Sequence, residues 1–148
     1  DMHKVYQGLI GNNPTVRRGM GLYKDGSIII QDELKGKAKR TGSTKWGMDI
    51  RWQMMTPADV EIVNDHVARL TQNGKEMWLH LLAPNKAELE IESTEPPHEY
   101  DADNDGTRMV VFKARLDTPM KIKRLAVYLH PHEKAEDLPK VKSLYDWK

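Results

Sequence analysis

The stretch Trp46-Gly-Met-Asp-Ile-Arg-Trp-Gln-Met-Met-Thr56, closed by Pro57, decides the fold. Apolar side chains occupy its even-numbered positions from Trp46 to Met54, and polar residues, charged residues and one glycine stand between them. This alternation has the period of two that a β-strand with one buried face requires. Burying each of these apolar side chains stabilises the fold by roughly 1.5–3 kcal/mol before the entropy of ordering is subtracted. We therefore expect a central strand with other strands packed around it.

The composition is that of a globular protein without a marked overall charge. The 148 residues suit one domain, and 39% of them are apolar, so the chain is long enough to bury a core. The 23 Lys and Arg nearly balance the 22 Asp and Glu, which gives no reason to expect a nucleic-acid partner. There is no cysteine, and disulfides are therefore excluded.

Neither a membrane partner nor an export signal is expected from the sequence itself. No apolar run approaches the roughly 18–20 residues of a membrane span, and the amino terminus carries no basic segment followed by an apolar one. The sequence starts with Asp1-Met2, without an initiator at position 1. This start favours a processed or excised fragment.

The dipeptide Asp25-Gly26 predicts a first hairpin between the β-rich runs 16–24 and 27–35. Asp-Gly favours a two-residue type I′ turn, which fixes the register of the two strands. With that turn, Leu22 lies opposite Ile29 and Arg18 lies opposite Glu33. We expect the Arg18–Glu33 contact to be an ordinary surface ion pair.

Asn73-Gly74 predicts a second hairpin of the same type between residues 66–72 and 75–83. Its register places Arg69 opposite Trp78, where the guanidinium can stack on the ring as a cation–π contact. Stacking of a sugar on Trp78 is the minority alternative.

Further short strands complete an all-β pattern. They are expected at residues 60–63, 87–93, 108–116 and 121–130, and no segment shows a convincing amphipathic helix. We predict an all-β fold, an antiparallel β-sandwich of about eight to nine strands built from hairpins, with two facing sheets that are each wet on the outer side. Residues 1–148 form one domain, and the polar tail 133–148 docks on the sheet through Leu144, Tyr145 and Trp147.

A basic loop is the candidate substrate-binding site. Residues 36–45 are rich in Gly, Ser and Thr and carry Lys37, Lys39 and Arg40, and Lys35 and Lys45 extend the basic run. Lysine and arginine can bind the sulfate or carboxylate groups of an acidic polysaccharide. The alternative is a solvated basic loop with no ligand.

Two clusters of acidic residues are candidates for binding a cation. Glu88, Glu90 and Glu92 are expected on one face of the strand 87–93, where a polar sheet surface is the simpler interpretation. In the long loop 94–106, the positions of Asp101, Asp103, Asp105 and Gly106 match positions 1, 3, 5 and 6 of an EF-hand loop, but Phe112 stands where the bidentate Glu is required. A plain Asp/Asn/Gly turn is favoured, with calcium as the alternative.

We expect no metal site, no cofactor and no catalytic residue. His130 and His132 form an H-x-H pair, which is short of the three or four ligands that zinc needs. No serine stands in the context of a nucleophile elbow, and the glycines of 18–22 lack the spacing of a phosphate-binding loop. Five tyrosines and six histidines are available as bases, but the sequence brings no two of them together.

The order of these landmarks resembles the carboxy-terminal β-region of heparinase II/III-like polysaccharide lyases over nearly the whole chain. The resemblance is carried by strand and turn residues in the segments 1–8, 16–22, 28–34, 51–59 and 70–75. It implies that an α/α toroid precedes stacked antiparallel sheets, and that the family's catalytic Tyr, His and Asn and its structural zinc lie before this chain. No catalytic or zinc residue of the family therefore falls on a numbered position here.

Three hypotheses follow. The first is that the chain is not an enzyme on its own but the carboxy-terminal module of a bacterial lyase, periplasmic or secreted, that cleaves acidic polysaccharide. Its partners are then the upstream domains of its parent chain and, weakly or indirectly, the polysaccharide. The second is an independent carbohydrate-binding module with an exposed aromatic platform, for which Trp46, Trp52 and Trp78 are the candidates. The third and weakest makes the chain itself a small lyase.

Overall fold

The computed structural model describes residues 2, 4, 14–36, 48–96, 98, 100–116, 121–132 and 137–147. This part of the chain forms nine β-strands and a short 3-10 turn near its end. The strands are β1 (Thr15–Leu22), β2 (Ile28–Lys35), β3 (Met48–Thr56), β4 (Asp59–Asn64), β5 (Val67–Gln72), β6 (Lys75–Ala83), β7 (Glu90–Glu92), β8 (Arg108–Leu116) and β9 (Lys123–His130), and the turn is η1 (Leu144–Asp146). No helix among these residues is long and apolar enough to cross a membrane.

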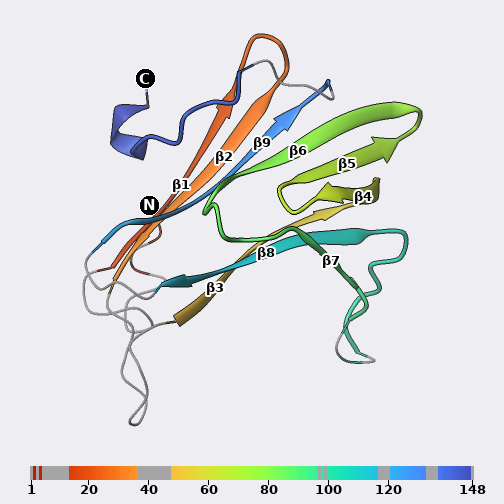
Figure 1. The fold of residues 1–148 in the computed structure, drawn as a ribbon. Helices are drawn as coiled ribbons and strands as arrows, with labels where there is room; N and C mark the ends of the chain where they lie inside the picture. The colour runs from red at the N-terminus through yellow and green to blue at the C-terminus, as the bar shows by residue number, and fades with distance from the viewer. Residues whose placement is uncertain are drawn as a thin grey trace.

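The strands form two antiparallel sheets that face each other (Figure 1). Six strands lie in the order β1-β2-β9-β6-β5-β4, and three lie in the order β3-β8-β7. Although β8 and β9 follow one another in the sequence, they belong to different sheets, so the chain crosses between the layers there. The prediction of an all-β, antiparallel sandwich of eight to nine strands is confirmed.

The core lies between the sheets and is built around β3. Ile50 and Trp52 are buried while Arg51 and Gln53 are exposed, as the period of two predicts. Trp52 stacks on Phe112 of β8 with a ring-centroid distance of 5.3 Å. Buried apolar residues of both sheets join this pair in one cluster, among them Val16, Leu34, Leu70, Leu79, Leu81, Val110, Leu125 and Val127.

The register predicted for the first hairpin is wrong by one residue. Leu22 pairs with Ile28, and Arg18 pairs with Asp32 instead of Glu33. The ion pair of Arg18 is therefore made with Asp32, through two hydrogen bonds of 2.7 Å.

A three-residue loop at residues 24–26 causes this shift. The Tyr23 N–H donates to the Ser27 C=O, and the Gly26 N–H donates to the Tyr23 C=O. Gly26 has a φ of 86°, which is the left-handed conformation that closes such a loop after a type I turn. The Asp25 carboxylate accepts a hydrogen bond from the Ser27 N–H at 3.0 Å and so stabilises the loop.

The prediction for the second hairpin is confirmed. Gln72 pairs with Lys75 across Asn73-Gly74, whose φ values of 52° and 73° are those of a type I′ turn. Arg69 lies opposite Trp78, with its guanidinium carbon 6.0 Å from the ring centroid.

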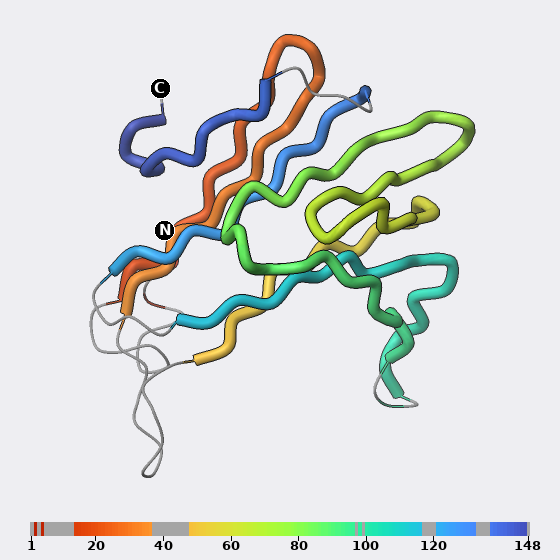
Figure 2. The backbone as a smooth tube through the Cα atoms, viewed as in Figure 1, coloured from red at the N-terminus to blue at the C-terminus, as the bar shows by residue number. Residues whose placement is uncertain are grey.

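The prediction that the outer face of each sheet is exposed to solvent is wrong for the six-stranded sheet. Gln31, Glu33 and Ala126, on the face turned away from the core, are fully buried. The carboxy-terminal segment 137–147 lies against this face, beside β1 (Figure 2). Gln31 Nε2 donates to a backbone C=O of this segment at 2.6 Å, and the Glu33 carboxylate accepts a backbone N–H from it at 3.1 Å.

Glycine in β1 makes room for this segment. A Cβ atom on Gly19 would lie 2.5 Å from Leu144 Cδ2 and 3.1 Å from Trp147 Cζ3. The guanidinium of Arg17, on the same face, lies 3.9 Å from the centroid of the Tyr145 ring. Leu144, Tyr145 and Trp147 thus contact the sheet through β1.

Candidate functional site

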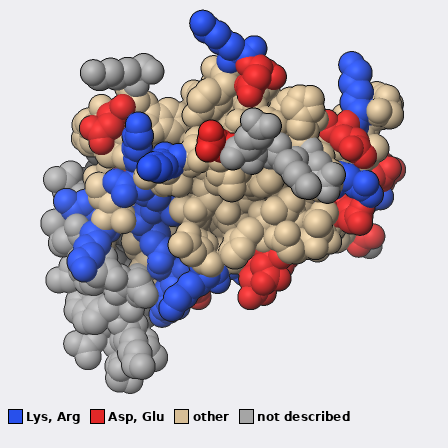
Figure 3. Space-filling view, turned by 45° about the horizontal axis from the view of Figure 1, so that its top comes forward, with Lys and Arg blue, Asp and Glu red and all other residues tan. Residues whose placement is uncertain are grey.

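Basic side chains gather at one end of the sandwich, where β2 ends and β9 begins. Figure 3 shows Lys and Arg mainly on the left of the view, whereas most of the Asp and Glu in view lie to the right. We call Lys35, Lys121, Lys123 and Arg124 the basic end. Leu34 pairs with Lys123 across the strands, which places Lys35 next to the start of β9.

The charges of the basic end are only partly neutralised. Arg124 Nε donates to the fully buried Glu33 carboxylate at 2.9 Å. Lys35, Lys121 and Lys123 form no ion pair with any residue that the structure describes. Three ammonium groups at this end are therefore available for an anionic ligand.

The predicted substrate-binding residues Lys37, Lys39 and Arg40 lie outside the described residues, as do Lys45 and Trp46. They follow the basic end directly in the sequence, because Lys35 is the last residue of β2. The described structure therefore places the start of this basic run but not the run itself.

Of the three glutamates predicted on the strand 87–93, Glu90 and Glu92 are neutralised by basic neighbours, and Glu88 precedes β7. The predicted strand 87–93 is shorter than expected, since β7 covers only Glu90–Glu92. Lys113 Nζ lies 2.8 Å from the Glu90 carboxylate and 3.2 Å from that of Glu92. Arg51 also reaches Glu92, at 2.7 Å. Hydrogen bonds to these two carboxylates raise the pKa of Lys113 and keep it charged.

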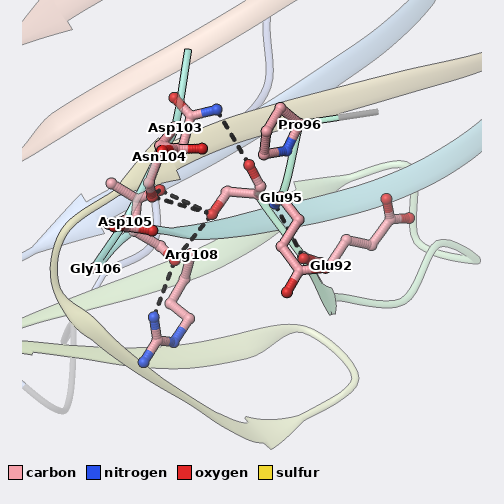
Figure 4. Close-up of a pocket in the computed structure, with 11 residues that line it drawn as sticks. Glu92, Glu95, Pro96, Asp103, Asn104, Asp105, Gly106 and Arg108 are labelled. Carbon is pink, nitrogen blue, oxygen red and sulfur yellow. Dashed lines mark hydrogen bonds between the residues drawn. The ribbon is translucent and has the colours of Figure 1, made fainter. Parts of the chain in front are cut away.

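The long acidic loop encloses a groove of about 410 Å³, which Glu92, Glu95, Asp103 and Asp105 help to line (Figure 4). Hydrogen bonds between side chains and the backbone hold the two ends of this loop together. Asn104 Nδ2 donates to the Thr94 C=O at 3.1 Å, and Thr107 Oγ1 donates to the Asn104 C=O at 2.6 Å. Among the described residues, no three His, Asp or Glu side chains are placed so that they could share a metal ion.

Of the tryptophans predicted to form an aromatic platform, the structure describes Trp52 and Trp78, and neither side chain is exposed. Trp52 is 3% exposed within the core, and Trp78 is 7% exposed on the opposite face of its sheet. Neither ring can therefore stack on a sugar without a rearrangement of the fold.

A groove beside the carboxy-terminal segment was not predicted. It has a volume of about 410 Å³ and lies between β1, β2 and residues 139–147. Tyr23 and Trp147 line it with aromatic rings, Ile29 adds apolar surface, and Lys140 and Lys142 supply positive charge. The sequence gave one indication of this groove, because Trp147 was expected to dock on a sheet. It did not indicate which strand Trp147 would contact.

The structure brings together a tyrosine and two histidines on the outer face of the six-stranded sheet. The Tyr128 ring lies 6.5 Å from that of His80 and 5.7 Å from that of His130, measured between centroids. All three side chains are buried, and none lines the grooves described above. Burial, and then the nearby His130, lower the pKa of His80, so its imidazole is neutral. This cluster lacks the access that a substrate base needs.

No family model and no curated protein matches this chain.

Proposed function

We propose that this chain is the non-catalytic, carboxy-terminal β-sandwich module of a heparinase II/III-like polysaccharide lyase. The parent enzyme is bacterial and exported, and it cleaves acidic polysaccharide by β-elimination in its upstream domains. The module supports the catalytic sheets of the parent and contributes a basic surface toward the substrate. The resemblance of the strand and turn residues supplies the family, and the basic end is the single observation in the structure that supports the contact with substrate.

The basic end suits a polyanion better than a small ligand. Its three lysines have no ion-pair partner among the described residues. They lie at the end of β2 and the start of β9, and none of them lines a groove described above. Each exposed charge contributes little alone and is screened by salt. A polysaccharide carries one anionic group after another, so several weak contacts add within one chain. Lys37, Lys39 and Arg40 extend the same basic run.

The test is binding of acidic and neutral polysaccharides to the chain by affinity electrophoresis at low and high salt. We expect retardation by the acidic polysaccharide alone, and weaker retardation as the salt concentration rises. The triple variant Lys37→Glu, Lys39→Glu, Arg40→Glu should bind about tenfold more weakly, equivalent to roughly 1.4 kcal/mol. Lys75→Glu with Lys86→Glu, which changes two exposed lysines elsewhere, is the control. Equal binding by all variants would remove the basic run from the proposal.

An independent carbohydrate-binding module is the second candidate. The groove with Tyr23, Trp147, Lys140 and Lys142 favours it, because aromatic rings stack on sugars and lysines attract their acidic groups. Lys140→Ala with Lys142→Ala separates the two candidates. A loss of polysaccharide binding in this variant, with binding retained in the triple variant, would favour the second candidate.

A further inference from the structure

β1 is an edge strand of the six-stranded sheet, because β2 is its single neighbour among the described strands. The N–H and C=O of a strand residue point to the same side of the strand, and the side alternates from residue to residue. Tyr23 donates its N–H toward β2, to the Ser27 C=O, whereas the Val16 C=O accepts the N–H of Met2. Odd-numbered residues of β1 thus bond to β2, and even-numbered residues present their backbone groups to the edge of the sheet.

The edge is occupied at Val16 but open at the other end of the strand. The Met2 N–H donates to the Val16 C=O at 2.8 Å, which is the kind of bond that joins neighbouring strands. At Met20 and Leu22, the backbone groups that face the edge have no hydrogen-bond partner among the described residues.

The side chains at this open end are apolar and exposed. Met20 is 67% exposed and Leu22 is 76% exposed. They pair with Ile30 and Ile28 of β2, which are half-buried and belong to the core side of the sheet. The opposite face of β1 is already covered by Leu144 and Trp147.

An edge of this kind is unusual in a protein without a partner. Proteins protect free edge strands with charged residues, proline or bulges, because an apolar edge pairs with other chains. Arg17 and Arg18 supply charge in the first half of β1, whereas the stretch 19–22 reads Gly-Met-Gly-Leu and carries none of these protections. An apolar strand edge next to a half-buried apolar face is a surface that fits one more strand.

We propose that the polypeptide leading into Met2 in the parent lyase forms a strand that pairs antiparallel with β1 along Met20 and Leu22. This inference rests on the proposed function, which makes the chain a module of a longer protein. The Met2–Val16 bond argues for this source, because a strand that ends at Met2 continues an existing contact. A strand that ends at Met2, opposite Val16, reaches Met20 and Leu22 when it runs antiparallel to β1, whereas a parallel strand would lie beside the residues before Val16.

The register of this strand can be stated. Met2 lies opposite Val16, and its side chain packs against the core. Because side chains alternate along a strand, the residues four and six positions before Met2 lie opposite Met20 and Leu22 on the same face. We expect both of these upstream residues to be apolar.

Hydrogen exchange of the natural gene product tests the inference against the 148-residue chain. The amides of Met20 and Leu22 should exchange at least roughly 100-fold more slowly in the longer product, because there they bond to the added strand. The amides of Gly19 and Gly21 bond to β2 and serve as the internal control, with similar protection in both proteins. Equal exchange of the Met20 and Leu22 amides in both proteins would overturn the inference.

A pair of substitutions gives a second readout. Met20→Lys with Leu22→Lys should lower the midpoint of thermal unfolding in the natural product and leave it nearly unchanged in the 148-residue chain. Met55→Lys, at a 47% exposed methionine of β3, should have little effect in either protein. Protection of Met20 that rises with the concentration of the 148-residue chain alone would assign the edge to a second copy and contradict the proposal. Polysaccharide binding tests the proposed function separately, because it does not depend on this edge.

Discussion

Glu33 is the residue on which the outer face of the six-stranded sheet depends. Its side chain is fully buried, and its carboxylate accepts hydrogen bonds from Arg124 Nε and from the Leu144 N–H. Glu33→Ala leaves both donors without their acceptor. We expect the free energy of unfolding to fall by about 2–3 kcal/mol, measured by urea denaturation. Glu61→Ala, which removes an exposed ion pair with Arg69, should cost less than about 1 kcal/mol. Similar losses in the two variants would contradict the role given to Glu33.

His80 makes the stability depend on pH. Burial, and then the charge of the nearby His130, lower the pKa of His80 below 6.5. The unfolded chain therefore takes up this proton at a higher pH than the folded protein does. The contribution of His80 to stability is complete above about pH 6.5 and is lost as the pH falls toward the folded pKa.

Urea denaturation between about pH 7.5 and pH 5 measures this effect. We expect His80→Leu to lose less stability over this range than the wild-type chain does. His98→Gln, at an exposed histidine, should follow the wild type. The assignment fails if His80→Leu retains the full pH dependence.

At the scale of elements, the two hairpins show how far turn chemistry can be predicted. Asn73-Gly74 has positive φ at both residues, and the type I′ turn and its register follow. Asp25-Gly26 is an equally good type I′ dipeptide, but the Asp25 carboxylate binds the Ser27 N–H and a three-residue loop forms. An Asp-Gly dipeptide is compatible with a two-residue type I′ turn and with a three-residue loop, so the sequence alone does not decide between these two turns.

The turn glycines are required for their conformation and not for space. Gly26 and Gly74 have φ values of 86° and 73°, and a Cβ at either position would meet nothing within 4 Å. We expect Gly26→Ala and Gly74→Ala each to lower the free energy of unfolding by about 1 kcal/mol through backbone strain alone. Lys24→Ala, in the same loop as Gly26, is the control. Thermal denaturation measures all three, and no loss in either glycine variant would refute this explanation.

Gly19 is required for space instead. Because a Cβ there would meet Leu144 and Trp147, we expect Gly19→Val to displace the carboxy-terminal segment from β1. Tryptophan fluorescence should then shift to longer wavelength as Trp147 becomes exposed. Gly74→Ala should leave the emission maximum unchanged, and an unchanged maximum in Gly19→Val would show that the segment does not depend on this glycine.

At the scale of the whole molecule, local patterns predicted the sheets but not what covers them. The alternation around Ile50 and Trp52 identified the core strand, because a run of nine residues is long enough to show which alternate side chains are apolar and which are polar. The burial of Gln31 and Glu33 was not predictable, because the segment that covers them lies more than a hundred residues away in the sequence. The basic run could be predicted because its lysines and arginine are neighbours in the sequence. The groove with Tyr23 and Trp147 could not, because it forms from segments that are distant in the sequence.

The size of the natural gene product tests the central claim most directly. An antibody raised against this chain should detect, in the source cells, a protein several times longer than these 148 residues, with the lyase chemistry in its upstream part. A product of about the length of this chain would contradict its assignment as a module of a polysaccharide lyase.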